Sequence, residues 1–133
     1  MEKLLLIVNI FLISCAVHNQ NNFRNLPGYQ IIAQKKWGSS TQFLFNTDSS
    51  FVICLKQAKP TAKNPLPRLS FFIYDINKER ILFEDSFENG TIHWMGPYQV
   101  EVIPMPGTVT VRGAVYSWIY DLKNKKRYQR KRE

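Results

Sequence analysis

Apolar and polar residues alternate with a period of two along much of the chain after residue 40. In the run SFVICLKQ, Phe51, Ile53 and Leu55 fall on one face, and the run YQVEVI repeats the pattern. Successive side chains of a strand point to opposite faces of a sheet, so such runs predict strands. Further runs that favour strands are TQFLFN, TIHWMG, TVTVRG and AVYSWIYDL. The chain has no helical period long enough to favour a helix bundle.

Turn signals separate these runs. We expect a β-hairpin with strands over 69–74 and 80–85, because Asp and Asn in the turn over 75–79 bond readily to the local backbone. Asn89-Gly90 predicts a second hairpin turn, and three prolines between Ala58 and Arg68 predict a loop. Turns spaced by roughly 8 to 12 residues predict an all-β fold. We therefore expect an antiparallel β-sandwich, immunoglobulin-like or similar, of about 7 to 8 strands, with a small β-barrel as the alternative.

A segment similar in sequence to the predicted hairpin occurs later in the chain. The segment IYDINKERI, from Ile73 to Ile81, resembles IYDLKNKKRY, from Ile119 to Tyr128. Similar hairpin chemistry explains the resemblance, and a duplicated unit is the alternative. Both explanations predict a hairpin after Asp121, with 127–130 as an edge strand whose charges discourage pairing between molecules.

The first residues have the pattern of an export signal. Leu4 to Ile13 is apolar except for Asn9 and follows Lys3. This run is shorter than the about 20 residues that a membrane-spanning helix needs, and a basic start before a short apolar run is typical of a cleavable leader. Small residues at 14 and 16 are compatible with ordinary signal peptidase, which would release a soluble secreted protein.

The segment Leu12-Ile13-Ser14-Cys15 resembles the lipobox of bacterial lipoproteins. This resemblance covers only the leader and implies nothing about the fold. It implies that the Cys15 thiol carries a diacylglyceryl group and that residues 1–14 are removed. Because Ala16, and not Asp, follows the cysteine, the resemblance also implies an outer-membrane location in a diderm bacterium, facing the periplasm. We favour lipidation over the soluble alternative.

Composition divides the remainder into three parts. Residues 15–28 are polar and rich in Asn, as in a flexible tether, residues 29–122 are the predicted sandwich, and residues 123–133 form a basic C-terminal tail. Cys54 lies in an alternating apolar run, where a cysteine is usually a small buried hydrophobe. If Cys15 is acylated, the two cysteines cannot pair, and the core alone must hold the fold.

The formal net charge of +8 is concentrated in the basic tail. Its basic residues are Lys123, Lys125, Lys126, Arg127, Arg130, Lys131 and Arg132. They are either solvated surface charge or a contact for anionic lipid headgroups beside the acyl anchor. An exported protein seldom meets nucleic acid, so we expect no nucleic-acid partner.

Patterns that would indicate catalysis are missing from the sequence. It has no G-x-S-x-G, no H-E-x-x-H, no cysteine pair at metal-ligand spacing and no glycine-rich phosphate loop. His93 is the only histidine in the predicted sandwich. We therefore expect a non-enzymatic protein without a metal or cofactor, and a small hydrolase centred on His93 is the weaker alternative.

The aromatic residues offer the remaining candidate site. Tyr116, Trp118 and Tyr120 share one face of a predicted strand, and Trp94 lies in another. Buried, these rings would form core, which is our leading interpretation; exposed, they would form a platform for sugar rings. We therefore expect an envelope lipoprotein that binds or supports another envelope component, either a protein or a glycan. A glycan-binding accessory module is the alternative, and the sequence leaves the oligomeric state open.

Overall fold

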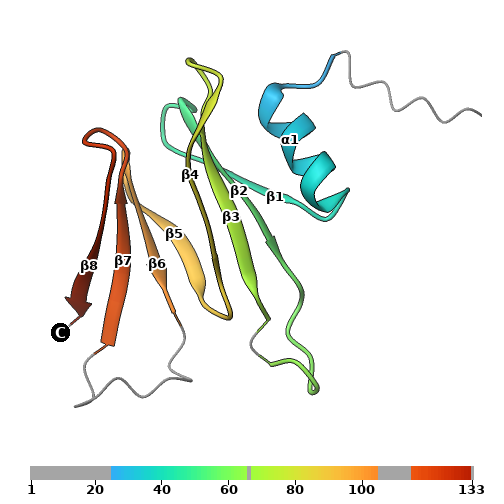
Figure 1. Cartoon of the computed structure of the whole chain (residues 1–133), viewed down its shortest axis with the longest axis vertical. Coiled ribbons are helices and arrows are strands. Elements are labelled where there is room, and N and C mark those ends of the chain that lie inside the picture. Colours follow the sequence, from blue (N-terminus) through green and yellow to red (C-terminus); the bar gives the residue numbers. More distant parts are fainter. Residues whose placement is uncertain (1–24, 66, 105–114, 133) are drawn as a thin grey trace, which may run out of the picture.

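A computed structural model of the chain describes residues 25–65, 67–104 and 115–132. In these residues, one helix and eight strands follow each other (Figure 1). They are α1 (Gly28–Trp37), β1 (Gln42–Phe45), β2 (Phe51–Gln57), β3 (Leu69–Asp75), β4 (Arg80–Phe87), β5 (Thr91–Gly96), β6 (Gln99–Ile103), β7 (Val115–Asp121) and β8 (Lys126–Arg132). The expected strand TVTVRG lies outside the described residues.

The eight strands form two antiparallel sheets of four strands, which confirms the predicted all-β sandwich. The first sheet has the order β1-β2-β3-β4 and the second has the order β5-β6-β7-β8, so each sheet is a simple meander. An immunoglobulin domain differs, because its chain passes repeatedly between the sheets in Greek-key connections. Here the chain passes from one sheet to the other between β4 and β5.

Apolar side chains from the facing sides of the two sheets form the main core. The predicted face of β2 contributes Ile53 and Leu55, β3 contributes Phe71, and β6 contributes Val100 and Val102. All five side chains are buried. Removing apolar surface from water stabilises the folded state by roughly 25 cal/mol per Å². This layer therefore holds the two sheets against each other.

Helix α1 was not predicted from the sequence, in which the tether was expected to lead directly into strands. Ala33 and Tyr29 of the helix are buried against the side of the first sheet that faces away from the second sheet. Trp37 stacks on Phe72 of β3, with ring centroids 5.6 Å apart. Both sides of the first sheet are thus covered. Within the described ranges, no helix is long and apolar enough to span a membrane.

The turn at Asn89-Gly90 has a different role from the predicted one. We expected a hairpin there, but β4 and β5 do not pair and belong to different sheets. Gly90 has φ 147°, and a Cβ at this position would lie 2.8 Å from the Ile103 carbonyl oxygen. A glycine therefore lets the chain pass close to β6 as it changes sheets.

The two similar segments occupy equivalent places in the two sheets. IYDINKERI spans the turn between β3 and β4, and IYDLKNKKRY spans the turn between β7 and β8. The hairpin predicted after Asp121 is confirmed, because Asp121 pairs with Lys126 and β8 is the edge strand of its sheet. Most of the basic tail therefore belongs to the sandwich, and the folded body extends past Leu122 to Arg132.

Candidate functional site

Four hairpin turns meet at one end of the sandwich, at the top of Figure 1, and we call this the turn end. A cleft of about 400 Å³ opens there between the two sheets. Phe51, Leu82 and Leu122 give it an apolar floor. Its polar lining consists of Asp48, Ser50, Asp75, Asn77, Lys78, Arg80, Tyr98, Lys123 and Lys125. This cleft could not be predicted from the sequence, because its residues come from all four hairpins.

Hydrogen bonds between the turns hold the cleft in shape. The buried Asn46 side chain donates to the Pro97 carbonyl oxygen at 2.9 Å and accepts from the Phe51 backbone N–H at 2.9 Å. Asn46 thereby joins the β1–β2 turn to the β5–β6 turn. The Leu122 backbone N–H donates to the Tyr98 carbonyl oxygen at 2.9 Å, which fixes the β7–β8 turn to the same connection.

The two similar hairpins contribute turns of the same construction. Asp75 accepts from the Lys78 backbone N–H at 3.0 Å, and Asp121 accepts from the backbone N–H groups of Lys123 and Asn124, both at 3.1 Å. The last loop residue has φ 52° in both turns, at Glu79 and at Lys125. The resemblance in sequence is thus matched by one local geometry, and each turn directs basic side chains to the cleft.

The acidic side chains of the cleft are engaged by local donors. Asp48 accepts hydrogen bonds from the Ser50 hydroxyl and from the Ser50 backbone N–H, and these bonds lower its pKa. Tyr98 donates to the second Asp48 oxygen at 3.2 Å, and this bond raises the pKa of the Tyr98 hydroxyl. Asp48 therefore stays ionised and serves to position Tyr98 and the turn.

The basic side chains of the cleft are free to meet a ligand. Lys78, Arg80, Lys123 and Lys125 are exposed, and none forms an ion pair with a carboxylate of the residues that the structure describes. The Lys123 ammonium lies 4.6 Å from the centroid of the Tyr98 ring. A cleft with an apolar floor and basic rim suits an anionic group that carries an apolar portion.

The predicted aromatic face of β7 is graded from buried to exposed. Tyr120 is in the core and only 1% exposed, Trp118 is partly buried, and Tyr116 at the far end is 39% exposed. The Arg127 guanidinium lies 3.9 Å from the centroid of the Trp118 ring, and so it covers a ring that sugar stacking would need. These three residues do not form the open platform of the glycan alternative.

Residues 126–132 of the basic tail form β8, and this strand distributes their side chains over different surroundings. The alternating side chains of β8 point to the two faces of the second sheet, and Arg127 bonds across to Asp85 of β4 at 2.9 Å. Arg130 lies on the other face, with a guanidinium nitrogen 3.6 Å from a Glu101 carboxylate oxygen. Lys123 and Lys125 precede β8 and line the cleft. Residues predicted as one basic group thus have separate surroundings.

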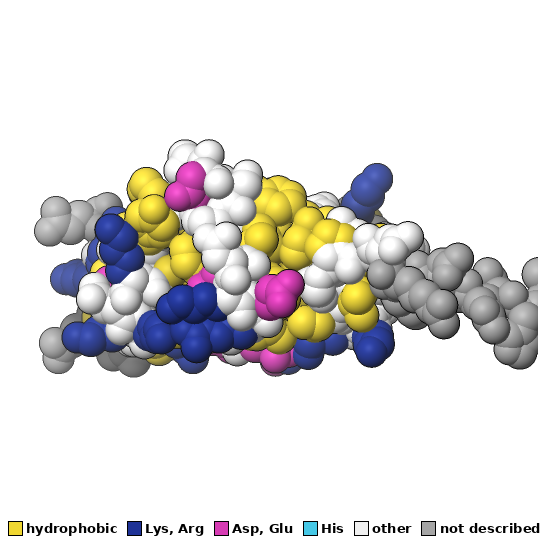
Figure 2. All heavy atoms as spheres, turned by 90° about the horizontal axis from the view of Figure 1, so that it is seen from above, with side chains coloured by type: hydrophobic (Ala, Val, Ile, Leu, Met, Phe, Trp, Pro, Cys, Tyr) yellow, Lys and Arg dark blue, Asp and Glu magenta, His cyan; other side chains and the backbone are white. Residues whose placement is uncertain are grey.

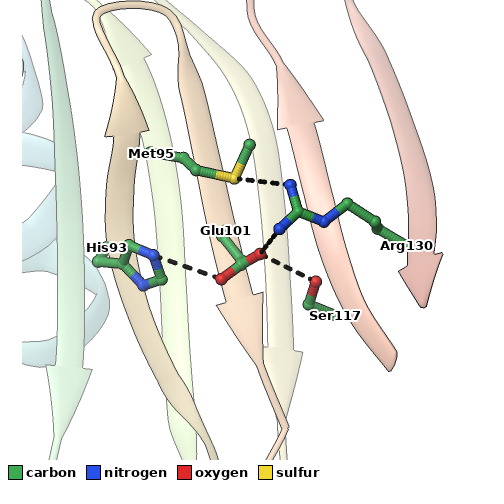
Figure 3. A network of polar contacts seen from close by, with 5 residues as sticks. All are labelled: His93, Met95, Glu101, Ser117 and Arg130. Atoms are coloured by element: carbon green, nitrogen blue, oxygen red, sulfur yellow. Dashed lines mark hydrogen bonds and ion pairs between the residues drawn. The ribbon is translucent and has the colours of Figure 1, made fainter. Parts of the chain in front are cut away.

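His93 lies in a polar network on the outer face of the second sheet, around the buried carboxylate of Glu101 (Figure 3). His93 Nε2 is 3.4 Å from one carboxylate oxygen, and the Ser117 hydroxyl donates to the other at 3.0 Å. A nucleophile must lie within hydrogen-bond reach of its base. Ser117 is fully buried and directed at Glu101, so this network positions charge and does not support the hydrolase alternative.

A second hollow of about 370 Å³ lies where β1 and β5 approach each other, lined in part by Phe45, Trp94 and Pro97. Phe45 is 43% exposed, whereas the Trp94 indole N–H donates to the Leu44 carbonyl oxygen at 3.0 Å. Trp94 is therefore held between the sheets with part of its surface open. Trp94 thus belongs to the lining of this hollow.

No family model, curated protein or solved structure matches this chain. Among the described residues, no three His, Cys, Asp or Glu side chains are grouped as a metal site. The cleft's residues and their geometry are therefore the basis for a functional proposal.

Proposed function

We propose that this protein is a non-enzymatic lipoprotein of the bacterial envelope that binds an anionic envelope component in its turn-end cleft. The lipid on Cys15 attaches it to the outer membrane on the periplasmic side. The lipobox-like leader supports the attachment. The observation that carries the binding role is the set of four basic side chains around the cleft, two from each of the similar hairpins.

The shape of the cleft supports binding more than catalysis. Its acids are held by Ser50, Tyr98 and backbone N–H groups, and its free charged groups are cations. Lys and Arg cations attract an anion without needing to exchange protons at neutral pH. A binding protein needs such a preformed complementary surface and no paired acid and base.

Cell fractionation tests the proposed location. The wild-type protein, produced in a diderm bacterial host, should sediment with outer membranes and remain there after a wash with high salt. The Cys15→Ser variant should lose this salt-resistant attachment, because it has no thiol to acylate. A wild-type protein recovered in the soluble cytosolic fraction would contradict the proposal.

The hollow between β1 and β5 favours a second candidate function, the binding of a neutral glycan. Phe45 and Trp94 offer aromatic surface beside Asn46 and Thr47, and sugar rings stack on such surfaces. Titration with envelope oligosaccharides should then change tryptophan emission in the wild type but much less in Trp94→Phe. An equal change in both proteins, or none in either, rejects this candidate.

A further inference from the structure

The turn end gathers basic side chains that are far apart in the sequence. Lys78 and Arg80 come from the first similar hairpin, and Lys123 and Lys125 come from the second. Figure 2 looks onto this end from above and shows Lys and Arg side chains gathered over the second sheet, on the left. The fold thus concentrates at one end a positive charge that is dispersed along the chain.

Acidic side chains at this end oppose that charge, but most of them are held by local donors. Asp75 is buried, and both it and Asp121 are directed at the backbone N–H groups of their own turns. Asp48 and Glu79 are exposed carboxylates at this end, and Asp48 is bonded to Ser50 and Tyr98. The exposed tip of the second hairpin is basic, with Lys123 and Lys125 on either side of Asn124.

The N-terminal part of the chain joins the body at the same end. Helix α1 begins at the upper end of the body in Figure 1, and a Cβ on Gly28 would lie 2.5 Å from the hydroxyl of Tyr74, next to the end of β3. Cys15 precedes Asn25 by ten residues, which can span at most about 35 Å. An anchor at Cys15 therefore brings the turn end to the membrane more readily than the opposite end.

We propose that the turn end binds the headgroups of anionic phospholipids in the membrane that holds Cys15. The four hairpin turns then face the membrane, and the opposite end of the sandwich points away from it. This inference takes the location of the protein from the proposed function. The basic rim of the cleft attracts the lipid phosphates. The diacylglyceryl group holds the chain at the membrane, and the basic residues add an electrostatic attraction that turns this end of the body toward the headgroups.

This orientation separates the basic residues of the tail by function. Lys126 pairs with Asp121 at the turn end, whereas Arg132 pairs with Val115 at the opposite end. A strand rises by about 3.3 Å per residue, so the two ends of β8 lie roughly 20 Å apart. Attraction to a membrane falls off within a Debye length, about 8 Å at physiological salt. Lys123 and Lys125 therefore contact the headgroups, and Lys131 and Arg132 do not.

Vesicle binding of the full-length Cys15→Ser chain tests the inference without relying on acylation. Vesicles of phosphatidylcholine are compared with vesicles of equal parts phosphatidylcholine and phosphatidylglycerol, at low and at high salt. The apolar leader is common to all the proteins, so only the difference between the two vesicles reports electrostatic binding. We expect binding to the anionic vesicles to exceed binding to the neutral vesicles and to weaken as salt rises.

Two variants with equal charge locate the contact. One replaces the turn-end residues with Gln, as Lys78→Gln, Arg80→Gln, Lys123→Gln and Lys125→Gln. The control is Lys59→Gln, Lys63→Gln, Lys131→Gln and Arg132→Gln, which removes the same charge from exposed positions at the opposite end. We expect the turn-end variant to bind anionic vesicles at least about tenfold more weakly than the control, because each basic residue near the surface adds to the attraction.

A fluorescent label reports the orientation directly. In the Cys15→Ser chain the remaining cysteine is Cys54, which is buried and poorly reactive because burial raises its pKa to about 12. A new cysteine at Asn77→Cys, on the turn end, or at Asn64→Cys, in the loop between β2 and β3, can therefore be labelled selectively. The label at 77 should change its emission on anionic vesicles, and the label at 64 should not.

Several results would overturn the inference. Equal weakening of both charge variants would mean that net charge alone drives binding. A stronger response at 64 than at 77 would reverse the orientation. If inorganic phosphate or glycerol phosphate shifts the label at 77 but anionic vesicles do not, the cleft takes a soluble anion and not a lipid. None of these results depends on Cys15, so failure of the acyl anchor is detected separately by cell fractionation.

Discussion

At the scale of single residues, Tyr120 shows how one side chain joins the two sheets. Its ring packs edge-on against Phe71 and Phe83, and its hydroxyl donates to Asp85 of β4 at 2.7 Å. Arg127 bonds to the same Asp85 oxygen. The residue that sequence analysis assigned to an aromatic face therefore closes the core between β4 and β7.

Removing this hydroxyl should weaken the fold measurably. A hydrogen bond to a charged acceptor contributes about 1.5 to 3 kcal/mol, so Tyr120→Phe should lower the free energy of unfolding in urea by that amount. Tyr116→Phe is the matched control on the same face of β7, and its loss should be close to zero because Tyr116 is far more exposed than Tyr120. Equal losses in the two variants would contradict the role given to Tyr120.

Buried groups also set the response of the protein to alkaline pH. Burial raises the pKa of Cys54 to about 12 and raises the pKa of Tyr120 above its usual range, with a further contribution from Asp85. These groups stay neutral in the folded protein while they ionise in the unfolded chain. Their contribution to stability is therefore complete below pH 9 and is lost as pH rises.

We expect the urea midpoint of the wild type to fall steadily from pH 9 to pH 11. Cys54→Val, which keeps a small apolar side chain without a titratable group, should show a shallower fall over the same range. The comparison requires that both proteins remain folded at pH 7 with similar near-ultraviolet circular dichroism. A midpoint that does not change up to pH 11 would refute this assignment of buried neutral groups.

At the scale of elements, helix α1 makes the first sheet a layer covered on both sides. Trp37 stacks on Phe72, and Lys36 forms an ion pair with Glu84 of β4. The outer face of the second sheet has the Glu101 network, and no helix among the described residues packs on it. The two sheets are thus similar in strand order but different in what covers their outer faces.

Removing the Trp37 side chain, which packs α1 against Phe72 of the first sheet, should destabilise the protein. Trp37 is partly buried, so Trp37→Ala should cost about 2 to 3 kcal/mol, somewhat less than the usual loss for a fully buried aromatic residue. Urea unfolding followed by far-ultraviolet circular dichroism measures the change. The control Gln34→Ala, on the exposed side of the helix, should leave stability unchanged within about 0.5 kcal/mol. Similar losses in both variants would mean that the packing against Phe72 contributes little.

Most elements could be predicted because their signals are local. Alternation placed Phe51, Ile53 and Leu55 on the inner face of β2, and Asp-containing turns located the two similar hairpins. Helix α1 was missed because its ten residues mix Gln, Lys and apolar residues with little periodicity. Asn89-Gly90 was misinterpreted because a turn signal does not reveal whether the next strand pairs with the previous one or joins another sheet.

The candidate site was beyond prediction for a different reason. Asp48, Arg80, Tyr98 and Lys123 become neighbours only when the two meanders stack. The sequence pattern indicated the hairpins that supply Arg80 and Lys123 but contained nothing about their shared end. Similarly, the basic tail could be recognised, whereas its division between the cleft, Asp85 and Glu101 follows from the strand pairing of β8.

At the scale of the whole molecule, the two sheets share one core, so we expect them to unfold together. Phe71 is fully buried between them, and Phe71→Ala should cost about 3 to 5 kcal/mol. Urea unfolding of that variant should remain a single transition by both tryptophan fluorescence and circular dichroism. Two separate transitions would show that the sheets are independent units.

We propose that Cys15 carries the lipid that holds this body at a membrane. The intact mass of the protein purified from a bacterial host, compared with that of Cys15→Ser, detects this lipid. We predict a wild-type species that begins at Cys15 and carries the added mass of a diacylglyceryl group, and no such species in the variant. A wild-type chain without added mass that begins after Ala16 would contradict the claim.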